Sequence, residues 1–170
     1  MIKVIISTQP FVEIFIYNIK RESIKNLQLK TKAMIAPNEM NDNELLEKIE
    51  NCSLSPTFFT HEVLLRMTYI LIKKYGIEEA VSKNCEIKEQ YFLKALNSNK
   101  FNYTLTRAYT EILHHFMSYT KNTSFDKLLR DYPRLRYNFK DLVRTHYGYD
   151  ILKEHRKEDS LPPRPILFTF

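Results

Sequence analysis

Apolar side chains recur every three or four positions over the middle of the chain, the spacing of one helix face. A first helix is predicted to start at Asn41, in a sequence typical of a capping box, and a second to start at Thr60. Gly76 stands where a left-handed residue ends the second helix, and a third follows over about 77–96. The inward positions predicted for these helices are Leu45, Leu46, Ile49, Cys52, Val63, Leu64, Met67, Ile70, Leu71, Ala80, Val81, Ile87, Tyr91 and Ala95.

The strongest helical pattern lies near residues 101–120. Its apolar face consists of Phe101, Leu105, Ala108, Ile112, Phe116 and Tyr119. Thr123 or Ser124 then begins a short helix that stops before Pro133. Another short helix is predicted to begin at Asn138 and to end before Gly148.

The two ends of the chain differ in pattern from the middle. Residues 1–17 hold two β-branched and aromatic runs divided by polar residues and a proline, which predicts a short β-hairpin. Three prolines after residue 160 forbid a helix there and favour an extended tail. The pattern therefore predicts an all-α bundle of four to six helices over 40–158, with an N-terminal extension over 1–39 and a tail over 159–170.

The glycine content supports this fold class and excludes some chemistry. Only 2 of the 170 residues are glycine, whereas about 7% is usual. Two glycines cannot form a G-x-G-x-x-G or Walker A loop, so dinucleotide and P-loop sites of the usual kind are excluded. The length is that of a single domain with a sizeable core.

The net charge of +6 is concentrated at the two ends of the chain. Residues 1–39 carry 6 basic and 3 acidic groups, 40–120 carry 9 and 10, and 121–170 carry 11 and 7. The densest basic cluster, called the basic surface below, consists of Arg130, Arg134, Arg136, Lys140 and Arg144. It is interpreted as a solvated face or, alternatively, as a site for an anion or for an acidic protein partner. Nucleic acid is a minor alternative, because no RNA-recognition or zinc-finger motif is present.

Cysteine usage and the absence of a membrane-spanning run point to the cytoplasm. Cys52 and Cys85 belong to no C-x-x-C motif, and both are expected to be reduced. The N-terminal apolar run lacks the cleavage site of a signal peptide, and no stretch approaches about 18 apolar residues.

The residues show no metal or nucleophile motif. There is no H-E-x-x-H and no G-x-S-x-G, and His114 and His115 point in directions about 100° apart on one helix. Each histidine is interpreted first as a hydrogen-bonded side chain at the core edge, with a ligand or catalytic role as the alternative. No metal site is predicted, and the cofactor and any reaction stay unspecified.

Four separated stretches carry a resemblance to a known family. They are FTHEVLLR (59–66) with the following KYG (74–76), KFNYTLT (100–106), YPRLRYNFKDL (132–142) and HYGYD (146–150). Over about residues 40–155 they resemble a family of small bacterial helical proteins without an established activity. Members show F-x-H-x-x-H-L, then K-Y-[HN]-x-T-x-T, then a Pro-Leu segment that leads to a Tyr-Tyr or His-Tyr pair.

The resemblance implies a polar pocket between the second and fourth predicted helices, which binds a metal ion or a small molecule. His61 matches the family's first histidine, but Leu64 stands in place of the second and Asn102 in place of a frequent third. The resemblance therefore does not imply a complete three-histidine metal site in this chain. The candidate ligand-binding residues that it leaves are His61, Asn102, Thr104, Thr106, His146 and Tyr147.

Overall fold

The structure is a computed structural model that describes residues 35–120 and 123–147. The chain divides into two units, Met1–Glu39 and Met40–Phe170. In the first unit the described residues include one turn of 3-10 helix, η1 (Pro37–Glu39). The hairpin predicted over 1–17 and the tail predicted over 159–170 lie outside the described residues.

The described part of the second unit is built from six α-helices and contains no strand, so the all-α prediction is confirmed. A 3-10 turn, η2 (Pro56–Phe58), precedes the longest helix. The helices are α2 (Asp42–Glu50), α3 (His61–Lys94), α4 (Tyr103–Tyr119), α5 (Phe125–Asp131), α6 (Arg134–Tyr137) and α7 (Phe139–Tyr147). In the described residues, none of these helices is long and apolar enough to cross a membrane.

Polar caps set where four of the helices begin. In each, a side-chain oxygen accepts a hydrogen bond from the backbone N–H three residues later, which satisfies one of the unpaired donors of the first turn. The capping residues are Asn41, Thr60, Asn102 and Ser124. The sequence predicted three of these capping residues. It also predicted the helix near 101–120, but with Asn102 as a ligand-binding residue rather than as its cap.

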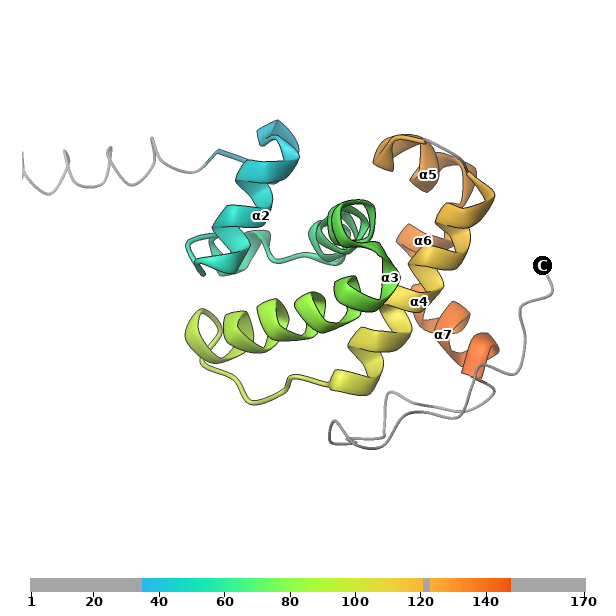
Figure 1. Ribbon diagram of the computed structural model, residues 1–170. Helices are drawn as coiled ribbons and strands as arrows, with labels where there is room; N and C mark the ends of the chain where they lie inside the picture. Colours follow the sequence, from blue (N-terminus) through green and yellow to red (C-terminus); the bar gives the residue numbers. More distant parts are fainter. Residues whose placement is uncertain (1–34, 121–122, 148–170) are drawn as a thin grey trace, which may run out of the picture. The chain divides into compact units, whose positions relative to one another are not determined.

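A sharp kink at Gly76 divides α3 into two halves, 61–75 and 77–94 (Figure 1). Gly76 has φ 75° and ψ 174°, a combination that is essentially restricted to glycine. The predicted break is therefore confirmed. In a straight helix His61 and Lys88 would be about 40 Å apart, whereas the kink turns the second half away from the axis of the first.

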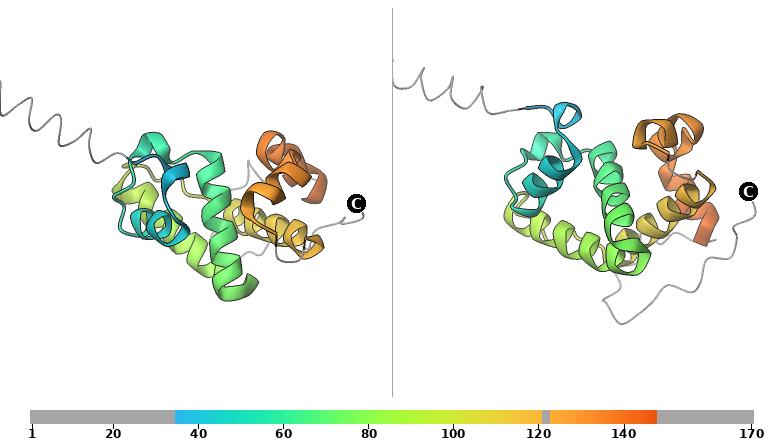
Figure 2. Two further views of the ribbon diagram at one scale, coloured as in Figure 1. Left: turned by 90° about the horizontal axis from the view of Figure 1, so that it is seen from above. Right: turned by 45° about the horizontal axis from the view of Figure 1, so that its top comes forward.

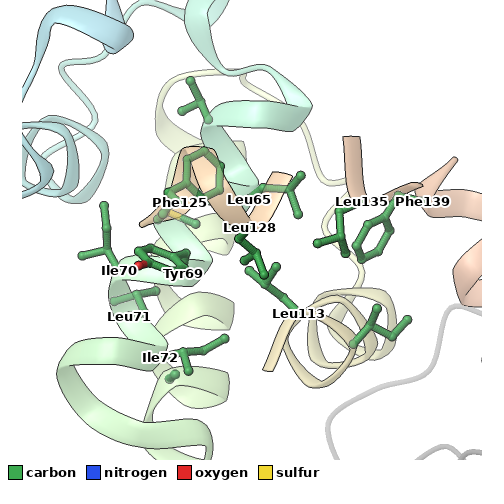
Figure 3. Close-up of a cluster of buried hydrophobic side chains, with 14 of the residues drawn as sticks. Leu65, Tyr69, Ile70, Leu71, Ile72, Leu113, Phe125, Leu128, Leu135 and Phe139 are labelled. Carbon is green, nitrogen blue, oxygen red and sulfur yellow. The ribbon is translucent and has the colours of Figure 1, made fainter. Parts of the chain in front are cut away.

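α3 lies at the centre of the second unit (Figure 2). Helix α2 packs against α3, α4 packs against α3 along another side, and α7 covers part of α4. Leu65 of α3, Leu113 of α4, Leu128 of α5 and Leu135 of α6 are fully buried and belong to one cluster (Figure 3). This core fixes how the polar side chains between the same helices meet.

Three details of the sequence prediction were wrong. Helix α6 was not predicted, because Pro133 was expected only to stop a helix, whereas it serves as the N-cap of α6, where no N–H is needed. Tyr119 was expected in the core but is 62% exposed, because it ends α4 and its ring lies against His115. Cys52 was placed on the first helix, but α2 ends at Glu50 and Cys52 has a positive φ of 57°.

Candidate functional site

The ring of Tyr109 on α4 is enclosed by side chains from two other helices. Phe139 of α7 stacks on it with ring centroids 3.8 Å apart and planes inclined by 28°. The Nζ atom of Lys88, on the second half of α3, lies 4.8 Å from the ring centroid. At this distance the face of the ring attracts a cation.

His61, the first residue of α3, joins this arrangement through both ring nitrogens. Its Nε2 lies 2.8 Å from the backbone oxygen of Leu135, a carbonyl that can only accept, so Nε2 carries the proton and donates. Nδ1 then accepts a hydrogen bond from the Tyr109 hydroxyl. The contacts thus select the neutral Nε2–H tautomer of His61.

The environment of His61 also favours this neutral form. Burial lowers the pKa of His61 below its usual value of 6.5, and the nearby charge of Lys88 lowers it further, against the opposing effect of the Leu135 hydrogen bond. Burial likewise raises the pKa of Tyr109, so its hydroxyl keeps the proton that it donates.

Lys88 is the most unusual group of the cluster. Its side chain is buried, with 5% of the residue exposed, and burial lowers the pKa of its amine from 10.5 to about 8. Within residues 35–120 and 123–147, no carboxylate lies within ion-pair distance of its Nζ atom. Buried lysines are normally paired, so this amine is a candidate functional group. We call Lys88, Tyr109 and His61 the lysine cluster.

One helical turn before Lys88, a second polar group holds the same helices together. The Asn84 amide nitrogen donates to the hydroxyl oxygens of Thr68, at 3.0 Å, and Thr110, at 2.8 Å. Each threonine hydroxyl donates its own proton to the carbonyl four residues earlier on its helix. Asn84 thereby links the two halves of α3 to α4, and the position of Lys88 against Tyr109 follows from this link.

The residues predicted from the sequence do not all lie at the lysine cluster. His61 does, whereas Asn102 caps α4 about 10 Å along the helix from Tyr109, by a rise of 1.5 Å per residue. The Tyr147 hydroxyl donates to Glu111 at 2.8 Å, on a different face of α4 from Tyr109. Thr104, Thr106 and His146 are buried.

The sequence analysis did not single out Lys88 or Tyr109, although helical spacing carried a signal for both. Lys88 follows Val81 by seven positions and precedes Tyr91 by three, which places it on the buried stripe of α3. Tyr109 lies four positions after Leu105 and three before Ile112, on the predicted inward face of α4. A lysine is ordinarily assigned to solvent, so pattern alone did not reveal its burial.

The basic surface has a different character. Arg136 pairs with Glu62 at 2.6 Å and Arg144 with Asp141 at 3.5 Å. The remaining three, Arg130, Arg134 and Lys140, are exposed, and among the described residues no carboxylate lies within ion-pair distance of them. They differ in this from Arg136 and Arg144, which each have an ion-pair partner.

A groove of about 210 Å³ lies between the end of α2 and the second half of α3. Its lining residues are Glu50, Lys83, Glu86, Ile87 and Gln90. None of the predicted ligand-binding residues lines it. In the part of the chain that the structure describes, no three His, Cys, Asp or Glu side chains are grouped so that they could hold a metal ion.

Comparison of the chain with protein-family models, with curated proteins and with solved structures finds no match. The family resemblance therefore rests on its four motifs alone.

Proposed function

We propose that this chain binds a small anionic molecule, a carboxylate or a phosphate compound, at the lysine cluster. The observation that carries the proposal is the buried amine of Lys88, which has no carboxylate within ion-pair distance among the described residues. A ligand anion would supply the missing counter-ion.

Because the amine of Lys88 is buried, a bound anion would stabilise its charge strongly. An ammonium group away from water loses hydration, and a nearby negative charge compensates more effectively in this low-dielectric environment than it would at the surface. Lys88 is mostly protonated at pH 7, because its pKa is about 8. The proposal therefore assigns Lys88 the role of charge partner.

The aromatic neighbours of Lys88 suit a small ligand. Tyr109 and His61 are each half-buried, so both side chains are partly exposed to solvent. Tyr109 is held by Phe139 and by its hydrogen bond to His61, which gives the site a fixed wall. The sequence-based expectation of a small-molecule site that includes His61 is kept in this proposal, with Lys88 and Tyr109 in place of the more distant candidates.

The first test is native mass spectrometry of the protein as purified, which would reveal a retained small anion as added mass. In parallel, thermal unfolding of the full chain is measured with increasing acetate and with increasing inorganic phosphate, at constant ionic strength. A ligand that binds only the folded state raises the midpoint, and the rise keeps growing with the logarithm of the ligand concentration above the dissociation constant.

The Lys88→Met variant is expected to lose that rise, whereas the matched variant Lys83→Met keeps it. Lys83 lies on the same helix half, also over a tyrosine ring, but has a carboxylate neighbour. An equal rise in the two variants would show that the anion binds elsewhere, and would overturn the proposal.

A second candidate function is supported by the basic surface, where Arg130, Arg134 and Lys140 are exposed without a carboxylate neighbour among the described residues. Tyr137, between them in the sequence, is 73% exposed. These groups suit an acidic protein partner. Binding of polyglutamate that is lost in an Arg130→Gln/Arg134→Gln/Lys140→Gln variant would support this function, whereas tighter binding of a DNA duplex would favour nucleic acid instead.

A further inference from the structure

The same amine meets the structural requirements of a nucleophile. Reaction with a carbonyl group needs an unprotonated amine that is held in place and shielded from bulk water. With a pKa of about 8, roughly a tenth of Lys88 is unprotonated at pH 7, against less than a thousandth of a lysine with the ordinary value of 10.5. Desolvation of a lysine in an apolar pocket is a recognised way to activate it.

Among the described residues, the amine of Lys88 has an aromatic ring beside it and no carboxylate within ion-pair distance. Its Nζ atom lies over the Tyr109 ring, 4.8 Å from the centroid, and makes no ion pair with a carboxylate of the described residues. Lys83, five positions earlier, is by contrast half-buried and lies 3.6 Å from the Glu79 carboxylate. The two amines therefore differ in burial and in the presence of a carboxylate neighbour.

We propose that Lys88 is a covalent site, whose amine forms an imine with a small carbonyl compound that carries an anionic group, of the 2-oxo acid class. This inference rests on the proposed function, because it specifies how the same cluster would hold its anionic ligand. The ligand's charge is attracted to the protonated amine on approach, and its carbonyl carbon is the atom that the unprotonated amine attacks.

The reaction is balanced without an oxidant or a reductant. The Nζ lone pair forms a bond to the carbonyl carbon, and the carbonyl oxygen takes up a proton to give a carbinolamine. The C–O bond then breaks and the oxygen leaves as water with the second amine proton, so that amine and carbonyl yield imine and water. Protonation of the imine would place a cation over Tyr109 again, where the ring stabilises it.

The experiment traps the imine with a reductant that the test itself supplies. The full-length protein is incubated at pH 7 with glyoxylate and sodium cyanoborohydride, which converts an imine to a stable secondary amine. The extent of labelling at each lysine is then read by intact-mass measurement and peptide mapping. Lys88 is expected to be labelled at least tenfold faster than Lys83, and the Lys88→Met variant is expected to lose the fast phase that Lys83→Met retains.

Labelling of Lys88 no faster than of Lys83 would overturn the inference. If acetate and phosphate still stabilise the protein through Lys88 in that case, the proposed anion binding stands and only the covalent step fails. Propanal, a neutral aldehyde, serves as the comparator for charge. Lys88 could be labelled equally fast by propanal and by glyoxylate, with no stabilisation of the protein by acetate or phosphate. Such a result would show a reactive amine that does not select anions. It would overturn both the 2-oxo acid class and the proposed function.

Discussion

Two lysines on the second half of α3 lie at nearly the same distance from a tyrosine ring. The Nζ atom of Lys83 is 4.7 Å from the centroid of Tyr75, and that of Lys88 is 4.8 Å from the centroid of Tyr109. Lys83 is half-buried beside Glu79, whereas Lys88 is buried with no carboxylate within ion-pair distance in the described residues. The two environments thus share the aromatic contact and differ in hydration and charge.

This difference shows that the ring contact alone does not mark a functional group. A lysine over a tyrosine at the surface gains a modest attraction and keeps most of its hydration. The same contact in the interior replaces water only in part, so the amine is left with a lowered pKa and a free energy penalty for its charge. Each prediction below changes one member of this comparison.

The largest effect is expected from Lys88→Met, which keeps the apolar stem and removes the buried charge. The amine has a pKa of 10.5 when unfolded and about 8 when folded, so at pH 7 the substitution is expected to raise the free energy of unfolding by up to about 3 kcal/mol. Urea unfolding followed by circular dichroism, at pH 7 and at higher pH, measures this difference.

The pH dependence of the stability gained by Lys88→Met tests whether the gain comes from removal of a desolvated charge. Between about pH 8 and 10.5 the unfolded state binds more protons at residue 88 than the folded state, so the wild-type protein gains stability as the pH rises. The difference in free energy of unfolding between Lys88→Met and the wild-type protein should therefore decrease as the pH rises from about 8 to 10.5. Lys83→Met is expected to change the free energy of unfolding by less than about 1 kcal/mol at either pH. A gain from Lys88→Met that does not depend on pH would contradict the desolvation argument.

An intermediate effect is expected from Gly76→Ala, because both lysine–tyrosine arrangements depend on the kink. A Cβ atom at position 76 would meet no other atom within 4 Å, so crowding is not the obstacle. The obstacle is the backbone conformation, which alanine adopts only with strain. The substitution is therefore expected to lower the free energy of unfolding by about 1–3 kcal/mol. Ser82→Ala, at an exposed position of the same helix, is the control in the same denaturation experiment. Equal stability of the two variants would show that the kink does not need a glycine.

The smallest effect concerns the pKa of His61, which burial lowers first and the charge of Lys88 lowers further. Lys88→Met should therefore raise the pKa of His61, whereas Lys83→Met should leave it unchanged, as followed by NMR titration of the imidazole. As the pH falls, His61 is protonated at a higher pH in the unfolded state than in the folded state. The wild-type protein should therefore also lose stability as the pH falls below 6.5. If the pKa of His61 is unchanged in Lys88→Met, the charge of Lys88 does not influence the protonation of His61, and this prediction is wrong.

Much of the helical fold could be predicted from the sequence, because caps and apolar spacing are local. Asn41, Thr60 and Gly76 act where their neighbours in the chain predict. The site could be predicted only in part, because it joins residues distant in the sequence. His61 was singled out, but its partner Tyr109 lies 48 positions away and is brought to it by the packing of α4 on α3.

The family motifs did not indicate that Asn102 has a structural role as well. Asn102 was predicted to bind a ligand, which stays a prediction, and its side-chain oxygen accepts a hydrogen bond from the Leu105 N–H at 2.9 Å as the cap of α4. Capping residues and ligand-binding residues use the same side-chain atoms, so a motif cannot separate the two roles. The burial of Lys88 likewise depends on the packing of α4 on α3, which brings Tyr109 to it, rather than on its neighbours in the sequence.

Thr68 and Asn84, whose side chains meet, stand at equal distances along the chain from Gly76, eight residues before it and eight after it. The two halves of α3 therefore form arms of matched length, each about 12 Å from the vertex to the contact. Inserting or deleting a single residue in one arm would rotate everything beyond it by about 100° and turn one of the two side chains away. Between Thr68 and Asn84 the chain should thus accept substitutions far more readily than changes in length.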